Sequence, residues 1–119
     1  MRFMMMVKAD ADYEAGRPPD PRLMEAVGKH AMEMAAKGIL VETGGLRPTA
    51  HGARVDVIDG TVSVTDGPFT EAKELVGGYA ILQTESREQA IELGRQFMQL
   101  HADVLGPSYR GQLEIRQME

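Results

Sequence analysis

The sequence predicts an α+β fold of the ferredoxin-like type, with a βαβ unit, a hairpin and a second βαβ unit. Three observations predict it. Strand-like runs alternate with two long segments of helical periodicity. An Asp59-Gly60 pair separates two β-rich runs. The chain of 119 residues suits a single domain, 1–119, with its own core.

The first half of the chain begins with strand, loop and helix. Residues 2–8 are apolar on both faces, and residues 9–19 carry Gly and Pro-Pro without an apolar period, which indicates a loop. Asp20 is a suitable N-cap and Pro21 a suitable first helical residue. The helix should end at Gly38. Its apolar stripe comprises Leu23, Val27, His30, Ala31 and Met34.

Three further strands follow in the middle of the chain. Residues 39–46 form a strand whose Gly44-Gly45 pair indicates a bulge or a close backbone approach. Residues 53–58 and 61–65 flank Asp59-Gly60, the strongest short-range signal for a hairpin. This hairpin is the insertion between the two βαβ units.

The second half repeats the pattern of the first. Residues 75–84 form a strand, and residues 86–101 form a helix that Ser86 and Gln89 start as a capping box. After Gly106-Pro107, residues 112–118 supply the last strand. The apolar stripe of the second helix comprises Ala90, Leu93, Gly94, Phe97, Met98 and His101.

This order predicts an antiparallel sheet with two helices on one face. The strands carry apolar residues on both faces, so something must cover the face that the helices leave open. Packing of two copies through a two-fold axis is the commonest solution. The sequence therefore predicts a homodimer.

Composition excludes several classes of function. The net charge of −5 and the lack of a Lys/Arg cluster argue against nucleic-acid binding. No run approaches the ~20 apolar residues of a membrane span. The absence of cysteine suits a cytoplasmic protein and excludes thiolate chemistry. There is no phosphate-binding loop, dinucleotide motif or metal-ligand spacing, so we expect no cofactor and no metal.

The candidate site residues fall in one loop and on two helices. In the segment VTDGPFTEAKE, Asp66, Phe69, Glu71 and Lys73 either hold the loop in shape or offer a rigid site to a small polar ligand. In the structural interpretation, Phe69 anchors the loop on the core. His30 and His101 lie on the two apolar stripes, where they are either packed core histidines or groups that titrate in a cleft.

Several motifs resemble one known family. TDGPFTEAKE followed by Gly-Gly-Tyr is similar to the signature of the DGPF-domain, or YCII-related, proteins. The Met-rich first strand, the Asp-Pro helix start, the strand end ETGGL and the closing EIRQ are similar too. The resemblance covers nearly the whole chain.

The resemblance implies a ferredoxin-like fold that pairs into a dimeric α/β barrel, mostly in bacterial proteins without a characterised activity. Some are encoded beside sigma factors, but the acidic composition gives DNA binding no support. The wider group is thought to use a His–Asp pair with the histidine on the first helix. Here Val27 occupies the matching position, His30 lies about one turn later, and no carboxylate matches the aspartate.

Two functions remain open from the sequence. The first is a ligand-binding or regulatory homodimer whose cleft lies near the DGPF loop, with Phe69, Glu71, Lys73 and His101 as ligand contacts. The alternative is a cofactor-independent enzyme of the dimeric barrel type. In it, His30 would act as general acid or base, paired with Asp66 or Glu71, on a small polar or aromatic substrate. Related barrels also imply haem or metal chemistry as a third, less favoured reading.

Overall fold

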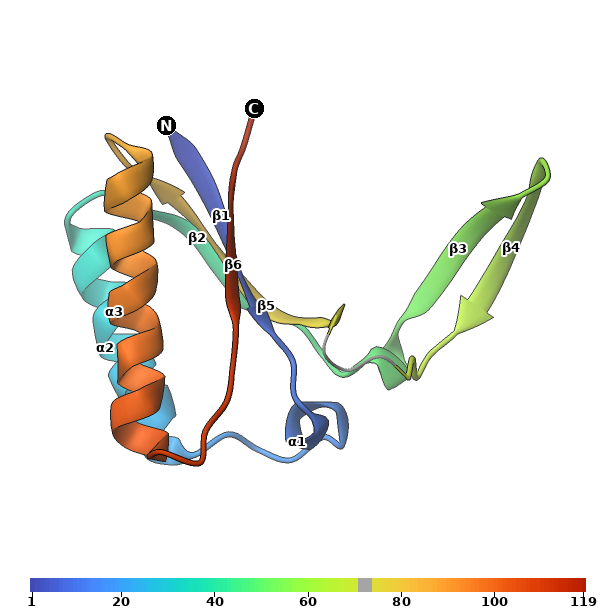
Figure 1. The fold of residues 1–119 in the computed structure, drawn as a ribbon, viewed down its shortest axis with the longest axis horizontal. Coiled ribbons are helices and arrows are strands. Elements are labelled where there is room, and N and C mark those ends of the chain that lie inside the picture. The colour runs from blue at the N-terminus through green and yellow to red at the C-terminus, as the bar shows by residue number, and fades with distance from the viewer. Residues whose placement is uncertain (71–73) are drawn as a thin grey trace.

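The structure is a computed structural model that describes residues 1–70 and 74–119. Within these residues, six strands and three α-helices follow one another (Figure 1). In order they are β1 (Arg2–Lys8), α1 (Ala11–Glu14), α2 (Pro21–Ala36), β2 (Leu40–Gly45), the 3-10 turn η1 (Thr49–His51), β3 (Ala53–Ile58), β4 (Thr61–Asp66), β5 (Val76–Gln83), α3 (Arg87–Leu105) and β6 (Leu113–Gln117).

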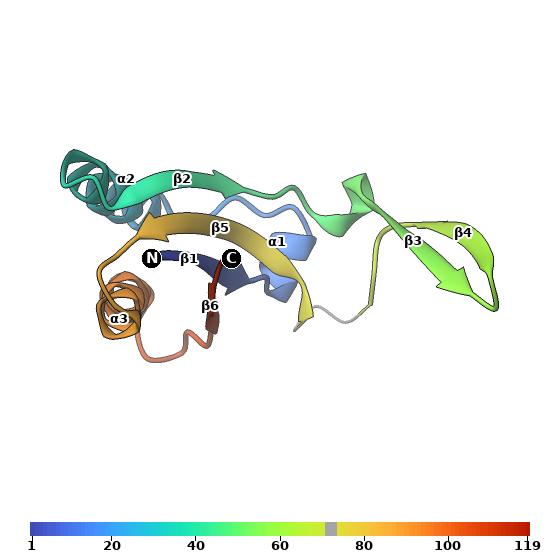
Figure 2. The same cartoon turned by 90° about the horizontal axis from the view of Figure 1, so that it is seen from above.

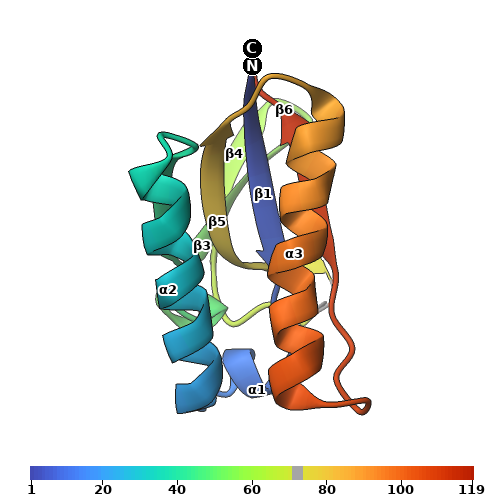
Figure 3. The ribbon, with the colours of Figure 1, turned by 90° about the vertical axis from the view of Figure 1, so that its left-hand side faces the viewer.

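The main sheet has four strands in the order β2-β5-β1-β6, and all its pairings are antiparallel. Strand β5 therefore separates β1 from β2, which is the split βαβ arrangement of the ferredoxin-like fold. Helices α2 and α3 lie side by side on one face of this sheet (Figures 2 and 3). The predicted α+β fold and its helix-covered face are confirmed.

Two elements differ from the sequence-based expectation. The predicted loop 9–19 contains the one-turn helix α1, which starts because the Asp10 side chain accepts a hydrogen bond from Tyr13 N at 2.7 Å. Helix α3 runs four residues beyond the predicted end at His101, to Leu105. It stops at Gly106, whose φ of 83° continues no right-handed helix.

The two long helices start as the sequence predicts. Asp20 Oδ1 accepts from Arg22 N at 2.8 Å, and the Arg22 side chain binds the same carboxylate, which holds the pKa of Asp20 below its ordinary value. Ser86 Oγ accepts from Gln89 N at 3.1 Å. The Gln89 side chain accepts in return from Glu85 N at 2.7 Å, one residue before the expected partner.

The core lies between the two helices and the sheet. Its buried centre is formed by Met5, Met34, Leu82 and Leu93, one from each of β1, α2, β5 and α3. Gly94 lets α3 approach β6 closely, since an added Cβ would lie 2.8 Å from Ile115 Cδ1. Both predicted apolar stripes therefore face the sheet, as their helical spacing indicates.

The β3–β4 hairpin projects from the sheet on the side away from α2 and α3 (Figures 1 and 3). All twelve residues of its two strands are exposed. The radius of gyration, 15.9 Å, exceeds the roughly 13.5 Å of a compact chain of this length because of this arm. An isolated two-stranded hairpin is marginally stable in water, so its apolar residues call for a partner.

The DGPF loop closes the base of the hairpin. Gly67 N donates to Gly52 O at 2.9 Å, and Phe69 N donates to Thr49 Oγ1 at 3.0 Å. Thr49 in turn donates through its amide and its hydroxyl to the Glu14 carboxylate, at 2.9 and 2.5 Å. Helix α1, which the sequence does not predict, thus supplies the carboxylate that holds η1 and the loop together.

Phe69 does not anchor this loop on the core as expected. Its half-buried ring lies 3.9 Å from the Arg54 guanidinium carbon and packs on strand β3. The favourable contact between a cation and an aromatic face accounts for this position. The tight fit of the loop instead depends on Gly67, where an added Cβ would lie 1.7 Å from Thr49 O.

Gly67→Ala should therefore be destabilising, because the backbone of either the loop or η1 must move. We expect a loss of about 1–3 kcal/mol in the free energy of unfolding, the usual cost of overpacking, measured by urea denaturation. Gly52→Ala is the matched control, since its Cβ would meet Thr49 O at an ordinary 3.5 Å. Equal effects of the two substitutions would contradict this account of the loop.

Candidate functional site

A cavity of about 320 Å³ lies between helices α2 and α3 and the face of the sheet that they cover. Most of its wall is apolar and comes from the inward stripes of both helices and from β1, β2 and β5. Ligand pockets typically occupy about 300–1,000 Å³ and combine apolar walls with a few polar groups. By size and lining, this cavity is the best candidate site among the described residues.

Glycines at the sheet create the space. Val7, Gly78 and Gly45 form one row across β1, β5 and β2, on the same face as Met5. Two of the three residues in the row have no side chain, and an added Cβ on Gly45 would meet nothing within 4 Å. These glycines therefore place no side chain in the space between the sheet and the helices at this end, and a cavity remains.

Two polar side chains line the cavity, those of His30 and Thr43. Tyr79 borders it through its backbone, because its ring lies against Gly44 on the other face of the sheet. The Thr43 hydroxyl donates to the Tyr79 carbonyl oxygen at 2.9 Å, which fixes the threonine side chain. Among the described residues, no Asp, Glu, Lys or Arg lines the cavity. The site therefore offers hydrogen bonds in an apolar setting but no counter-ion for a charged ligand.

His30 is the titratable imidazole of this site. It is half-buried on α2, and its ring centroid lies 6.4 Å from that of Phe97 on α3. No hydrogen bond or ion pair among the described residues engages its ring nitrogens, which leaves them available to a ligand. Val27, one turn earlier, lines the same cavity. Both residues of this turn of α2 therefore border the cavity.

His101 lies behind Phe97 and is not among the cavity-lining residues. Its Nδ1 is 3.0 Å from Phe97 O, and because a carbonyl only accepts, Nδ1 carries the proton. The ring packs between Phe97 and Tyr109, with centroid distances of 4.8 and 5.6 Å. Burial, together with the negative charge of Asp10, raises the pKa of Tyr109. Within one copy of the chain, His101 is therefore a packed core residue and does not line the cavity.

The DGPF-loop candidates lie elsewhere in the molecule. Asp66 is exposed at the end of β4, and Phe69 packs on Arg54 of β3. The hairpin that these two strands form lies across the sheet from α2 (Figure 1). Neither Asp66 nor Phe69 lines the cavity with His30 within one copy. Glu71 and Lys73 lie outside the described residues. The pairing of His30 with Asp66 or Glu71 stays a prediction.

Phe97 and Thr43 are the cavity residues that the sequence does not assign to a site. Phe97 belongs to the predicted apolar stripe of the second helix, and it also separates the cavity from His101. The two Gly-Gly pairs were the available signal. The sequence indicates a bulge or a close backbone approach at Gly44-Gly45, and Gly44, Gly45 and Gly78 all border the cavity.

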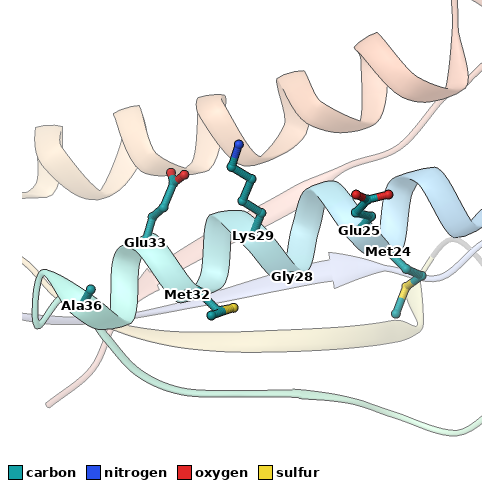
Figure 4. Close-up of a pocket in the computed structure, with 7 residues that line it drawn as sticks. All are labelled: Met24, Glu25, Gly28, Lys29, Met32, Glu33 and Ala36. Atoms are coloured by element: carbon teal, nitrogen blue, oxygen red, sulfur yellow. The ribbon is translucent and has the colours of Figure 1, made fainter.

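A second, broader depression of about 600 Å³ lies on the outer surface of α2 (Figure 4). It is formed by one helix alone, around Gly28, with Met24 and the 76% exposed Met32 beside it. Glu25, Lys29 and Glu33 border it. No second element encloses this depression, so it offers a ligand much less contact than the inner cavity.

Two searches of the described residues complete the survey. No group of three or more His, Cys, Asp and Glu side chains could hold a metal ion within residues 1–70 and 74–119. In the same part of the chain, no helix is both long and apolar enough to cross a membrane.

Comparisons with known proteins identify the family. One similar solved structure is 5-chloro-2-hydroxyhydroquinone dehydrochlorinase from Burkholderia phenoliruptrix AC1100, in complex with 2,5-dihydroxybenzoquinone. It is 12% identical, with a TM-score of 0.48 over 100% of this chain and 94% of that chain, a likeness that says nothing about ligand or reaction here. No curated protein matches. A family model described as the YCII-related domain matches residues 1–104, and the chain therefore belongs to the YCII-related family.

Proposed function

We propose that the protein binds a small, mainly apolar ring compound in the cavity between α2, α3 and the sheet. The cavity is the observation behind the proposal: it offers about 320 Å³ of space with the side chains of His30 and Thr43 on an otherwise apolar wall. An engineered apolar cavity of about 150 Å³ holds one benzene molecule, so this volume suits one substituted ring. The apolar stripes of α2 and α3 supply the surface that the ligand would contact.

The ligand should be uncharged and carry one hydrogen-bonding group. A buried carboxylate or phosphate needs a paired cation, and no described residue at the cavity supplies one. A hydroxyl group can instead donate to a free nitrogen of His30. A neutral phenol meets both requirements.

For the test, we expect 4-ethylphenol to raise the melting temperature and 4-ethylbenzoate to leave it unchanged. Ligand at 100 times its Kd adds about 2.7 kcal/mol of stability. In His30→Leu, 4-ethylphenol should lose up to about tenfold in affinity, the value of one hydrogen bond, while ethylbenzene binds as before. Calorimetry measures all three ligands.

Two further variants control this experiment. Gly45→Leu places a side chain in the open space beside the cavity and should abolish binding of 4-ethylphenol and ethylbenzene alike. His51→Leu changes an exposed histidine on η1 and should alter neither affinity. Full affinity for 4-ethylphenol in both His30→Leu and Gly45→Leu would refute the site.

The alternative function is general acid–base catalysis by His30 in the same cavity. The observation that favours it is an imidazole with free ring nitrogens on an apolar wall, where a ligand hydroxyl would meet it. Histidine is the side chain whose charge changes between about pH 5 and 8. A carboxylate partner such as Asp66 would orient the ring, as in the His–Asp pair that the family resemblance implies, and it would have to come from a second copy because Asp66 does not line this cavity within one copy.

For any ligand that the protein converts, kcat/KM should change with pH between about 5 and 8. His30→Gln should lower kcat/KM by roughly 10²–10⁴ and remove that pH dependence, because the amide cannot exchange the proton. Stopped-flow or discontinuous assays across this range provide the profile. A flat wild-type profile would remove His30 from the mechanism.

We also propose that two copies pack through the open face of the sheet. Met5 and Leu82 face the helices, so the alternating Met4 and Ile81 face the other side. One row across this open face runs Glu42, Ile81, Met4, Arg116. A two-fold axis parallel to the strands brings each acidic edge opposite the partner's basic edge, around an apolar centre.

Light scattering at micromolar concentration should give twice the chain mass of 13.0 kDa. Glu42→Lys and Arg116→Glu should each weaken the dimer, because each places like charges opposite one another. The double variant, which exchanges the two charges, should restore it. A wild-type monomer, or a double variant weaker than both single variants, would overturn this packing.

A further inference from the structure

The hairpin carries an apolar surface that no residue in the described part of the chain covers. In the register of β3 and β4, Val55 lies opposite Val64 and Val57 opposite Val62. Residues two apart and directly opposite share one face, so these four valines form a continuous patch, here called the valine face. Each valine exposes 64–70% of its surface.

The hairpin stands on the same side of the main sheet as the open face. Figures 1 and 3 show α2 and α3 on one side of the sheet and β3–β4 on the other. The bonds of Gly67 to Gly52 and of Phe69 to Thr49 hold the base of the hairpin. A body that covers the open face therefore also comes beside the hairpin.

The length of the hairpin shows how far it reaches. Two six-residue strands extend about 20 Å, whereas packed sheets lie about 10 Å apart. In the sheet-to-sheet dimer proposed above, the hairpin of each copy passes beyond the plane of the partner's sheet. It meets the partner's flank, where apolar residues are also exposed, including Val41 of the edge strand β2 and Leu46 just after it, at 45% and 43%.

We propose that the hairpin is a dimerisation arm whose valine face packs on a second copy of this chain. The inference rests on the proposed dimer and adds a second contact to it. The valine face itself holds only β-branched apolar side chains and no cation, which suits a protein surface and not a phosphate-bearing one. A two-fold axis gives both arms equivalent partners.

The test replaces the valine face without unfolding the hairpin. Val57→Thr combined with Val62→Thr keeps shape and strand propensity while adding two hydroxyl groups. Sedimentation equilibrium should show the dimer Kd rising at least tenfold. Ile58→Thr is the matched control, since Ile58 is 67% exposed on the opposite face of the same hairpin, and its Kd should change less than twofold.

Hydrogen exchange adds a readout within the wild-type protein. Amides of residues 53–66 should exchange slowly in the dimer and quickly on dilution to the monomer. If the Kd of the double variant is unchanged and the hairpin amides are unprotected, the proposal of a dimerisation arm is wrong. The charge-exchange variants then still test the sheet contact. Equal weakening by Ile58→Thr also overturns it, because the valine face would not be the contact surface. A wild-type monomer at all concentrations overturns arm and dimer together.

Discussion

Two helices can bury only one face of a four-stranded sheet, and the rest of this molecule depends on that limit. Strand β1 is central, and its alternate residues serve two environments. Met5 joins the core beneath α2 and α3, while Met4 lies on the face without helices. The covered face contains the cavity and the open face contains the proposed dimer contact. One strand therefore contributes side chains both to the cavity and to the proposed dimer contact, because the pleat points alternate residues to opposite faces.

The cavity arises from a local shortage of side chains and not from a gap between domains. Close packing fills protein interiors wherever side chains can reach. At the end of the sheet where β2 and β5 carry paired glycines, those glycines place no side chain between the strands and α2. The methionines around the space have flexible, polarisable side chains, which adapt well to ligands of varied shape. His30 gives that adaptable wall one directional group.

The DGPF loop has a structural role at the base of the hairpin, although its sequence also suggests a ligand site. Its hydrogen bonds run to η1 and, through Thr49, to Glu14 on α1. They hold the base of the hairpin, and Phe69 supports it from beneath Arg54. This loop connects the main body to the hairpin, and its residue Asp66 does not line the cavity that contains His30. A role of Asp66 in chemistry would need contact with a second copy.

The sequence alone determined the element order, the caps at Asp20 and Ser86, the hairpin and both apolar stripes, because these follow from local geometry and residue spacing. It also placed His30 on the inward face of α2. Contacts between distant segments decided the rest. Whether Gly45 and Gly78 leave a cavity depends on strands that pair from opposite halves of the chain. Helix α1, too short for a periodic signal, formed through one Asp10 cap and tied the DGPF loop to the body. The separation of Asp66 from His30 likewise follows from which face of the sheet each element occupies, and no spacing in the sequence encodes that.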